Sequence, residues 1–75
     1  MNRTKFSKTE MAIIDLLADS MGSVVSRESL LSNLRGAKSH TLDSHIMAIR
    51  RKLNESGDPY AIDTVPRVGF ILRSK

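Results

Sequence analysis

The chain has 75 residues, of which 40% are hydrophobic and 27% charged, and its net charge is +4. This size and composition predict one folded domain, with a core too small to hold a deep enzymatic pocket. The absence of cysteine excludes disulfides and thiolate metal sites, and no apolar run approaches the ~20 residues that span a bilayer.

The N-terminal part of the chain predicts a first helix. The opening residues, MNRTKFSK, have no apolar stretch after them and so are not a secretory signal, which leads us to expect a cytoplasmic protein. Ser7 and Glu10 stand in capping-box spacing, which predicts a helix from about residue 8 to residue 20, and Gly22 follows as a stop. The apolar residues on its expected buried face are Met11, Ile14, Leu17 and Ala18, widened by Ile13 and Met21.

The next segment, VVSRESLLSNLRG, predicts a second helix. Ser26 has the chemistry of an N-cap, the leucines that follow form an apolar stripe, and Gly36 is the expected stop. Val24 and Val25 precede the cap and favour a short extended segment, although two such side chains also suit the gap between packed helices.

The stretch SHTLDSHIMAIRRKL, from residue 39 to residue 53, predicts a third helix that is strongly amphipathic. Leu42, Ile46, Ile49 and Leu53 recur at helical spacing and define its buried face. The opposite face is small, mixed and mostly uncharged, and it ends in basic residues.

The C-terminal part predicts a β-hairpin. NESGDPY is a loop, and residues 60–65 and 69–73 are expected to form antiparallel strands joined by PRVG, which places Pro66 and Arg67 at the turn. Three helices followed by such a hairpin predict a mainly α domain with a C-terminal wing, which is a winged helix-turn-helix.

This architecture and its charge favour DNA as the partner. Basic residues concentrate in residues 1–8, 38–54 and 66–75, which favours a polyanionic ligand. A helix about 10–12 Å wide fits the major groove of B-DNA, where base edges are distinguishable. Met47 and Ala48 suit thymine methyl groups. The residues expected to contact base edges are Ser44, Met47, Ala48 and Arg51, with His40 as a weaker choice.

Other residues are expected to contact the DNA backbone. Arg50 and Lys52 lie at the borders of the outward face and suit phosphates, as does Lys38 just before the third helix. The cap at Ser26 offers backbone donors to a phosphate. Arg67, on a stiff turn, suits a narrow minor groove.

Metal binding and catalysis find no support in the residue pattern. His40 and His45 are five residues apart on one helix and point away from each other, so we expect no metal site. Asp15 and Asp19 are a solvated acidic pair, and no glycine-rich phosphate loop is present. We therefore expect neither an enzyme nor a cofactor.

Three segments together resemble a known family. VVSRESLL, TLDSHIMAIRRKL and IDTVPRVGFIL are similar, in order and spacing, to the OmpR/PhoB-type winged-helix effector domain of bacterial response regulators. The resemblance implies sequence-specific binding of double-stranded DNA, transcriptional control at the nucleoid, and phosphate contacts by His45 and Arg50. The residues that match the family's second and third motifs are Thr41, Asp43, His45, Ile46, Arg50, Lys52, Leu53, Ile62, Thr64, Val65 and Gly69.

The chain also departs from the family pattern. Met47 and Ala48 stand where many members have two basic residues, Pro66 stands where the wing arginine is expected, and Phe70 replaces a tyrosine. The link between the second and third helices is short, which argues against activation of RNA polymerase through that loop. A receiver domain and most of a preceding small sheet are missing, as in an excised fragment or in a free-standing minimal regulator.

Two other functions remain open at this stage. A winged helix can bind a protein partner, such as RNA polymerase or another regulator, and the Met47–Ala48 surface suits a mildly apolar contact. A non-specific nucleic-acid binder would share the basic charge but lack a preferred site. The small footprint, together with the family, suggests dimeric or tandem binding on DNA.

Overall fold

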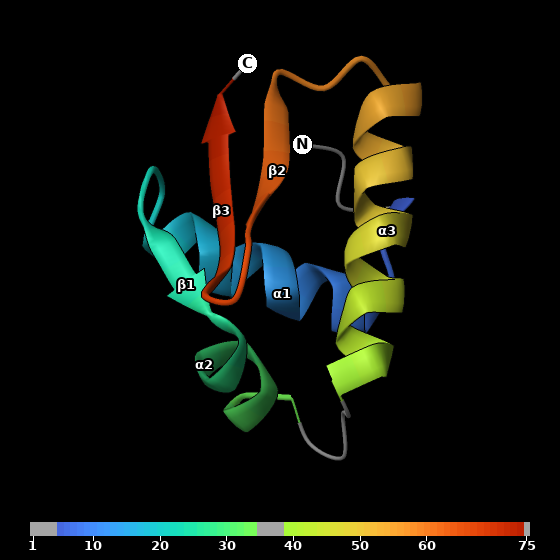
Figure 1. Cartoon of the computed structure of the whole chain (residues 1–75). Helices are drawn as coiled ribbons and strands as arrows, with labels where there is room; N and C mark the ends of the chain where they lie inside the picture. The colour runs from blue at the N-terminus through green and yellow to red at the C-terminus, as the bar shows by residue number, and fades with distance from the viewer. Residues whose placement is uncertain (1–4, 35–38, 75) are drawn as a thin grey trace.

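The computed structural model describes residues 5–34 and 39–74, except for the side chains of residues 39 and 40. These residues form three α-helices and a three-stranded antiparallel sheet with strand order β1-β3-β2 (Figure 1). In chain order the elements are α1 (Lys8–Asp19), β1 (Val24–Ser26), α2 (Arg27–Ser32), α3 (Ser39–Glu55), β2 (Tyr60–Val65) and β3 (Gly69–Ser74). No helix within this described part of the chain is both long enough and apolar enough to cross a membrane.

Helix α1 begins with the predicted capping box. The Ser7 hydroxyl accepts a hydrogen bond from the Glu10 backbone N–H at 3.1 Å, and the Glu10 carboxylate accepts one from the Ser7 N–H at 2.8 Å. These two bonds satisfy backbone donors that a helix start leaves unpaired. Ala18, predicted on the buried face, is exposed, because the buried stripe of α1 is centred on Ile13 and Leu17 and leaves Ala18 to one side.

Residues 24 and 25 are extended, as predicted, and β1 pairs with β3. What the sequence pattern did not reveal is that this segment adds a third strand to the hairpin. Helix α2 follows directly, with the Ser26 hydroxyl accepting from the Ser29 N–H at 3.1 Å.

Helix α2 is shorter than expected. It ends at Ser32 with Asn33 as its C-cap, whereas the predicted stop, Gly36, lies outside the described residues. The Asn33 side-chain amide donates to the Ser29 carbonyl at 2.7 Å. An asparagine side chain that bonds a nearby backbone carbonyl competes with continued helix, which explains the early end.

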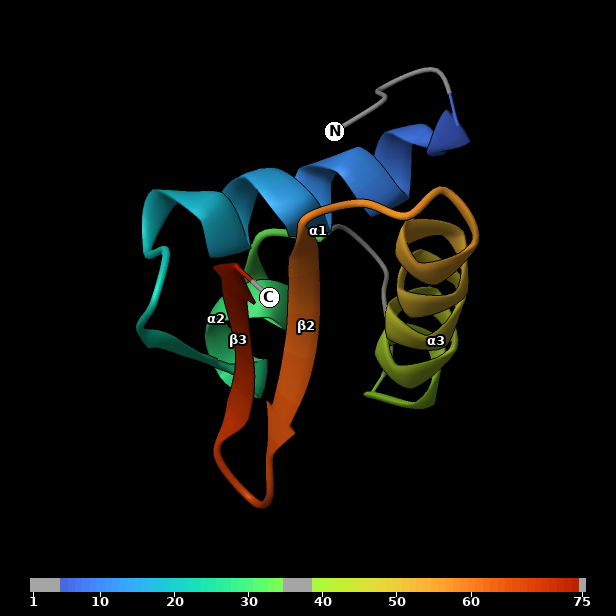
Figure 2. The ribbon, with the colours of Figure 1, turned by 90° about the horizontal axis from the view of Figure 1, so that it is seen from above.

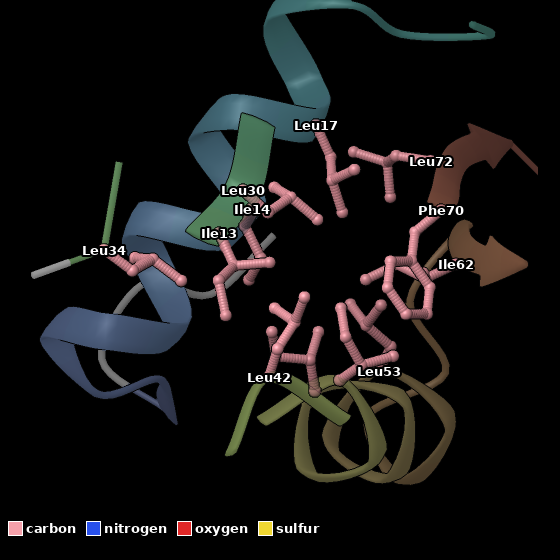
Figure 3. Close-up of a cluster of buried hydrophobic side chains, with 12 residues drawn as sticks. Ile13, Ile14, Leu17, Leu30, Leu34, Leu42, Leu53, Ile62, Phe70 and Leu72 are labelled. Carbon is pink, nitrogen blue, oxygen red and sulfur yellow. The ribbon is translucent and has the colours of Figure 1, made fainter. Parts of the chain in front are cut away.

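The core lies between the three helices and one face of the sheet (Figure 3). The four apolar residues predicted for the third helix are all buried there. Burial of such side chains is the main favourable contribution to folding a domain this small. The buried cluster is Ile13, Ile14, Leu17, Leu30, Leu34, Leu42, Ile46, Ile49, Leu53, Ile62, Phe70 and Leu72.

The hairpin forms where the sequence predicted it, with β3 one residue longer. The Val68 N–H donates to the Val65 carbonyl at 3.0 Å, which closes a four-residue turn around Pro66 and Arg67. Arg67 has φ of 65°, and proline followed by a left-handed residue is typical of a type II turn. Helix α3 packs beside β2, and the hairpin tip projects beyond the helices (Figure 2).

Candidate nucleic-acid interface

The outward face of α3 brings together four residues that the sequence predicted as base contacts. Ser44, Met47 and Arg51 are exposed, Ala48 is half-buried, and the four line one shallow hollow of about 370 Å³. The leucine and isoleucine side chains on the opposite side of α3 are buried in the core, so this face points toward solvent. Lys38 and the side chain of His40 lie outside the described residues.

The Arg51 side chain is exposed, and its ion pair with Glu55 is long. Its Nε lies 4.0 Å from the Glu55 carboxylate one turn further on, and the two side chains are 70% and 68% exposed. An exposed pair of this kind contributes little to stability. The guanidinium of Arg51 is therefore available to a ligand at low cost.

Arg50 connects α3 to the wing. Its Nε donates to the Ile62 carbonyl at 2.9 Å and its guanidinium also donates to the Thr64 hydroxyl, both on β2. Strand β2 is at one edge of the sheet, where backbone groups lack a neighbouring strand. Arg50 satisfies one of these groups and ties the helix to the wing, a role that the sequence did not reveal.

Lys52 faces α1. Its Nζ lies 2.6 Å from the Glu10 carboxylate and 5.8 Å from the centre of the Phe6 ring. Its charge is thus balanced within the domain, and the phosphate contact predicted for Lys52 remains a prediction.

The carboxylate that receives Lys52 is buried, and its pKa reflects several opposing influences. Burial raises the pKa of Glu10, whereas the hydrogen bonds from Lys52 and Ser7 and the charges of Lys52 and His45 lower it. The lowering influences prevail, so the pKa of Glu10 lies below its ordinary value of 4.5. His45, predicted as a phosphate contact, is half-buried on the same side of α3 as Lys52.

A second hollow separates the start of α2 from the wing tip. It measures about 430 Å³ and is lined by Ser26, Arg27, Glu28, Arg67 and Val68. It therefore brings together two residues, Ser26 and Arg67, that the sequence predicted as separate backbone and wing contacts.

Arg27 holds α2, α3 and β3 together at this place. Its guanidinium donates to the Asp43 carboxylate at 2.8 Å and lies 5.5 Å from the centre of the Phe70 ring. Its backbone N–H also donates to the Val68 carbonyl at 3.2 Å. Arg27 and Asp43 both lie in motifs noted in the sequence, but only the fold shows that they pair.

Among the residues that the structure describes, no three histidine or acidic side chains gather as a metal site would require. The candidate interface therefore consists of the exposed face of α3 and the projecting β2–β3 hairpin. The fold and this face define a winged-helix domain.

Comparisons with known proteins agree with this class. A family model described as "Transcriptional regulatory protein, C terminal" matches residues 2–72. The response regulator ArlR of Staphylococcus haemolyticus is 33% identical over 72 residues, which cover 91% of this chain and 33% of ArlR. The chain thus spans about a third of the length of this curated relative.

Two solved structures share the fold. The DNA-binding domain of the response regulator AdeR, in complex with an intercistronic region, aligns with a TM-score of 0.80 and 30% identity over 93% of this chain and 76% of that one. The DNA-binding domain of RstA from Klebsiella pneumoniae, in complex with the RstA box, aligns with a TM-score of 0.76 and 30% identity over 91% and 72%.

The chain belongs to the family of C-terminal domains of transcriptional regulatory proteins, the OmpR/PhoB type of winged helix. The solved relatives with this fold are DNA-binding domains of response regulators. The resemblance drawn from the three sequence motifs is confirmed.

Proposed function

We propose that this domain recognises its DNA site by placing α3 in the major groove and the β2–β3 hairpin on the adjacent minor groove or backbone. The observation that supports this most is the exposed α3 face of Ser44, Met47, Ala48 and Arg51, which lies opposite four buried apolar residues. A helix whose inner face is anchored in a core can present its outer face to base edges without rearrangement. The solved AdeR and RstA domains are complexes with DNA.

The proposal gives each predicted contact a role. Ser44, Met47, Ala48 and Arg51 face base edges, and His40, whose side chain lies outside the described residues, is a secondary choice for a base contact. Arg67, at the projecting turn, reaches the minor groove or backbone. The residues proposed for phosphates are Lys38, His45, Arg50 and Ser26, with Lys52 as a secondary choice because Glu10 already neutralises it.

The wider role of the protein is part of the same proposal. Because DNA is its ligand, we place its action in the bacterial cytoplasm, at the nucleoid. Tandem or dimeric binding to repeated half-sites and contact with RNA polymerase or another regulator are proposed on the strength of family membership.

The test is an unbiased selection from random duplexes, repeated with Arg51→Ala at two salt concentrations. We expect a defined motif that relaxes at particular positions in the variant, with a loss of roughly 1–3 kcal/mol there. Arg73→Ala is the matched control, since it removes one positive charge from a residue already paired with Asp63 and should leave the motif unchanged.

Binding without a motif, collapsing as salt rises, would instead identify a non-specific backbone binder. The rival favoured by a specific observation is a protein-interaction module, because Met47 is 69% exposed. Absence of DNA binding at both salt concentrations would support that rival.

A further inference from the structure

We propose that the centre of α3 reads thymine methyl groups, so that the site of this domain is defined partly by apolar contacts. This inference rests on the proposed function and specifies how the α3 face discriminates between bases. It begins from Met47, a large apolar side chain that is 69% exposed.

The position of Met47 and Ala48 within the α3 face is the first support. They are flanked by Ser44 on one side and Arg51 on the other, and all four line the same shallow hollow. At 1.5 Å per residue, Ser44 and Arg51 are separated by about 10 Å along the helix axis, roughly the rise of three base pairs. The apolar pair therefore lies over the middle of the short stretch of bases that this face can span.

The chemistry of the major groove supplies the second support. Thymine presents a methyl group there, whereas the other base edges present mainly hydrogen-bond donors and acceptors. Ala48 has no side-chain donor or acceptor, and the thioether of Met47 is only a weak acceptor. Against guanine, cytosine or adenine they would leave polar atoms dehydrated and unpaired, which is unfavourable. When thymine lies opposite, Met47 and Ala48 instead bury its C5 methyl group, which is favourable.

Charge complementarity commits this apolar surface to DNA rather than to a protein. Arg51 borders the hollow directly, and Arg67 stands exposed at the tip of the neighbouring wing. A net charge of +4 adds a general attraction to phosphates. An arginine beside an apolar pair suits guanine next to thymines, because arginine binds the O6 and N7 atoms of guanine.

The experiment replaces each thymine of the selected site, one at a time, by deoxyuridine. This change removes the C5 methyl group and keeps the Watson–Crick pair. Affinities are measured for the unmodified chain, for Met47→Ala and for Arg51→Ala, with circular dichroism confirming that each variant is folded. Alanine at the exposed Met47 position favours helix, so the fold should persist.

We expect deoxyuridine to weaken binding of the unmodified chain about fourfold at one or two thymines, the ratio that corresponds to burying one methylene-sized group. In Met47→Ala the penalty at one of these positions should fall to near unity. In Arg51→Ala overall affinity should fall while the deoxyuridine penalty persists. Thymines outside the motif should show no effect in any of the three proteins.

Two results would overturn the inference while leaving the proposed function intact. In one, a motif is selected but no thymine within it responds to loss of its methyl group. In the other, the penalty is the same with and without the Met47 side chain, which would assign it to DNA shape. If no motif is selected at all, the proposed function fails and this inference fails with it.

Discussion

Gly69 lies where β3 approaches β1 closely. A Cβ atom there would lie 1.9 Å from the Val25 carbonyl oxygen and 2.8 Å from the Ser26 Cα atom, both backbone atoms of β1. A backbone neighbour cannot move aside as the end of a flexible side chain can. The close pairing of β1 with β3 therefore depends on the missing side chain.

Gly69→Ala should lower the free energy of unfolding by about 3 kcal/mol, at the upper end of the range for overpacked sites. Urea titration followed by circular dichroism measures this loss. Gly57→Ala is the control, because Gly57 has φ of 65° and a Cβ atom there would meet nothing within 4 Å, so only its left-handed backbone opposes the change. Its cost should be about 1 kcal/mol. Equal losses in the two variants would contradict the packing explanation.

Arg67 combines an exposed charge with an unfavourable backbone conformation. Its φ of 65° is the region that L-residues other than glycine adopt at a cost. Arg67→Gly should therefore raise the free energy of unfolding by about 1 kcal/mol, whereas Arg67→Ala, which keeps the strained backbone, should not. Both variants lose the guanidinium, so both should weaken DNA binding to a similar extent. A difference in affinity between them would show that turn geometry, and not the charge alone, matters for binding.

At the scale of elements, one ion pair joins the start of α1 to the end of α3. Lys52 donates to Glu10 at 2.6 Å, and the same carboxylate caps α1 through Ser7. The pair thus adds a polar contact between α1 and α3 to their apolar packing. A buried charge left without its partner is destabilising, so the two residues depend on each other.

Glu10→Gln should lower stability by about 1–2 kcal/mol at pH 7, since glutamine keeps the capping geometry but loses a hydrogen bond between charged groups. The pKa of Glu10 is lowered in the folded state. Its contribution is therefore complete above the ordinary pKa of 4.5 and is lost as the pH falls through the lower folded pKa. The difference between the two proteins should shrink as the pH falls below 4.5.

Denaturant titrations across this pH range measure that difference. Glu55→Gln is the matched control, because Glu55 is 68% exposed and its pair with Arg51 is weak. It should change stability by less than about 0.5 kcal/mol at every pH. A gap between Glu10→Gln and the unmodified protein that persists unchanged to low pH would show that the charge of Glu10 is not responsible.

At the scale of the whole molecule, the size of the domain limits its footprint on DNA. The described residues extend over 29 × 23 × 19 Å, whereas one turn of B-DNA is about 34–36 Å long. We therefore expect one copy to cover about one half-site. A duplex with two half-sites one turn apart should bind two copies, and native mass spectrometry should detect that stoichiometry. One protein per duplex, even at excess protein, would contradict tandem binding.

The sequence by itself determined α1, α3, the start of α2 and the hairpin, because their signals are local. The capping box of Ser7 and Glu10, the 3.6-residue periodicity of α3 and the turn around Pro66 each lie within a few residues of chain. The exposure of Met47 followed from the same periodicity. The family motifs were readable for the same reason, since their spacing is fixed within single elements.

Only the tertiary structure decided which basic residues of α3 bond to other elements of the domain. In the sequence, Arg50 and Lys52 are both basic residues at the edge of the outward face of α3. In the structure, Arg50 donates to the edge strand β2, whereas Lys52 donates to the Glu10 carboxylate on α1. The Arg27–Asp43 pair and the addition of β1 to the hairpin were hidden in the same way. Such contacts join distant segments, and they depend on the angles at which helices and sheet pack, which no local pattern encodes.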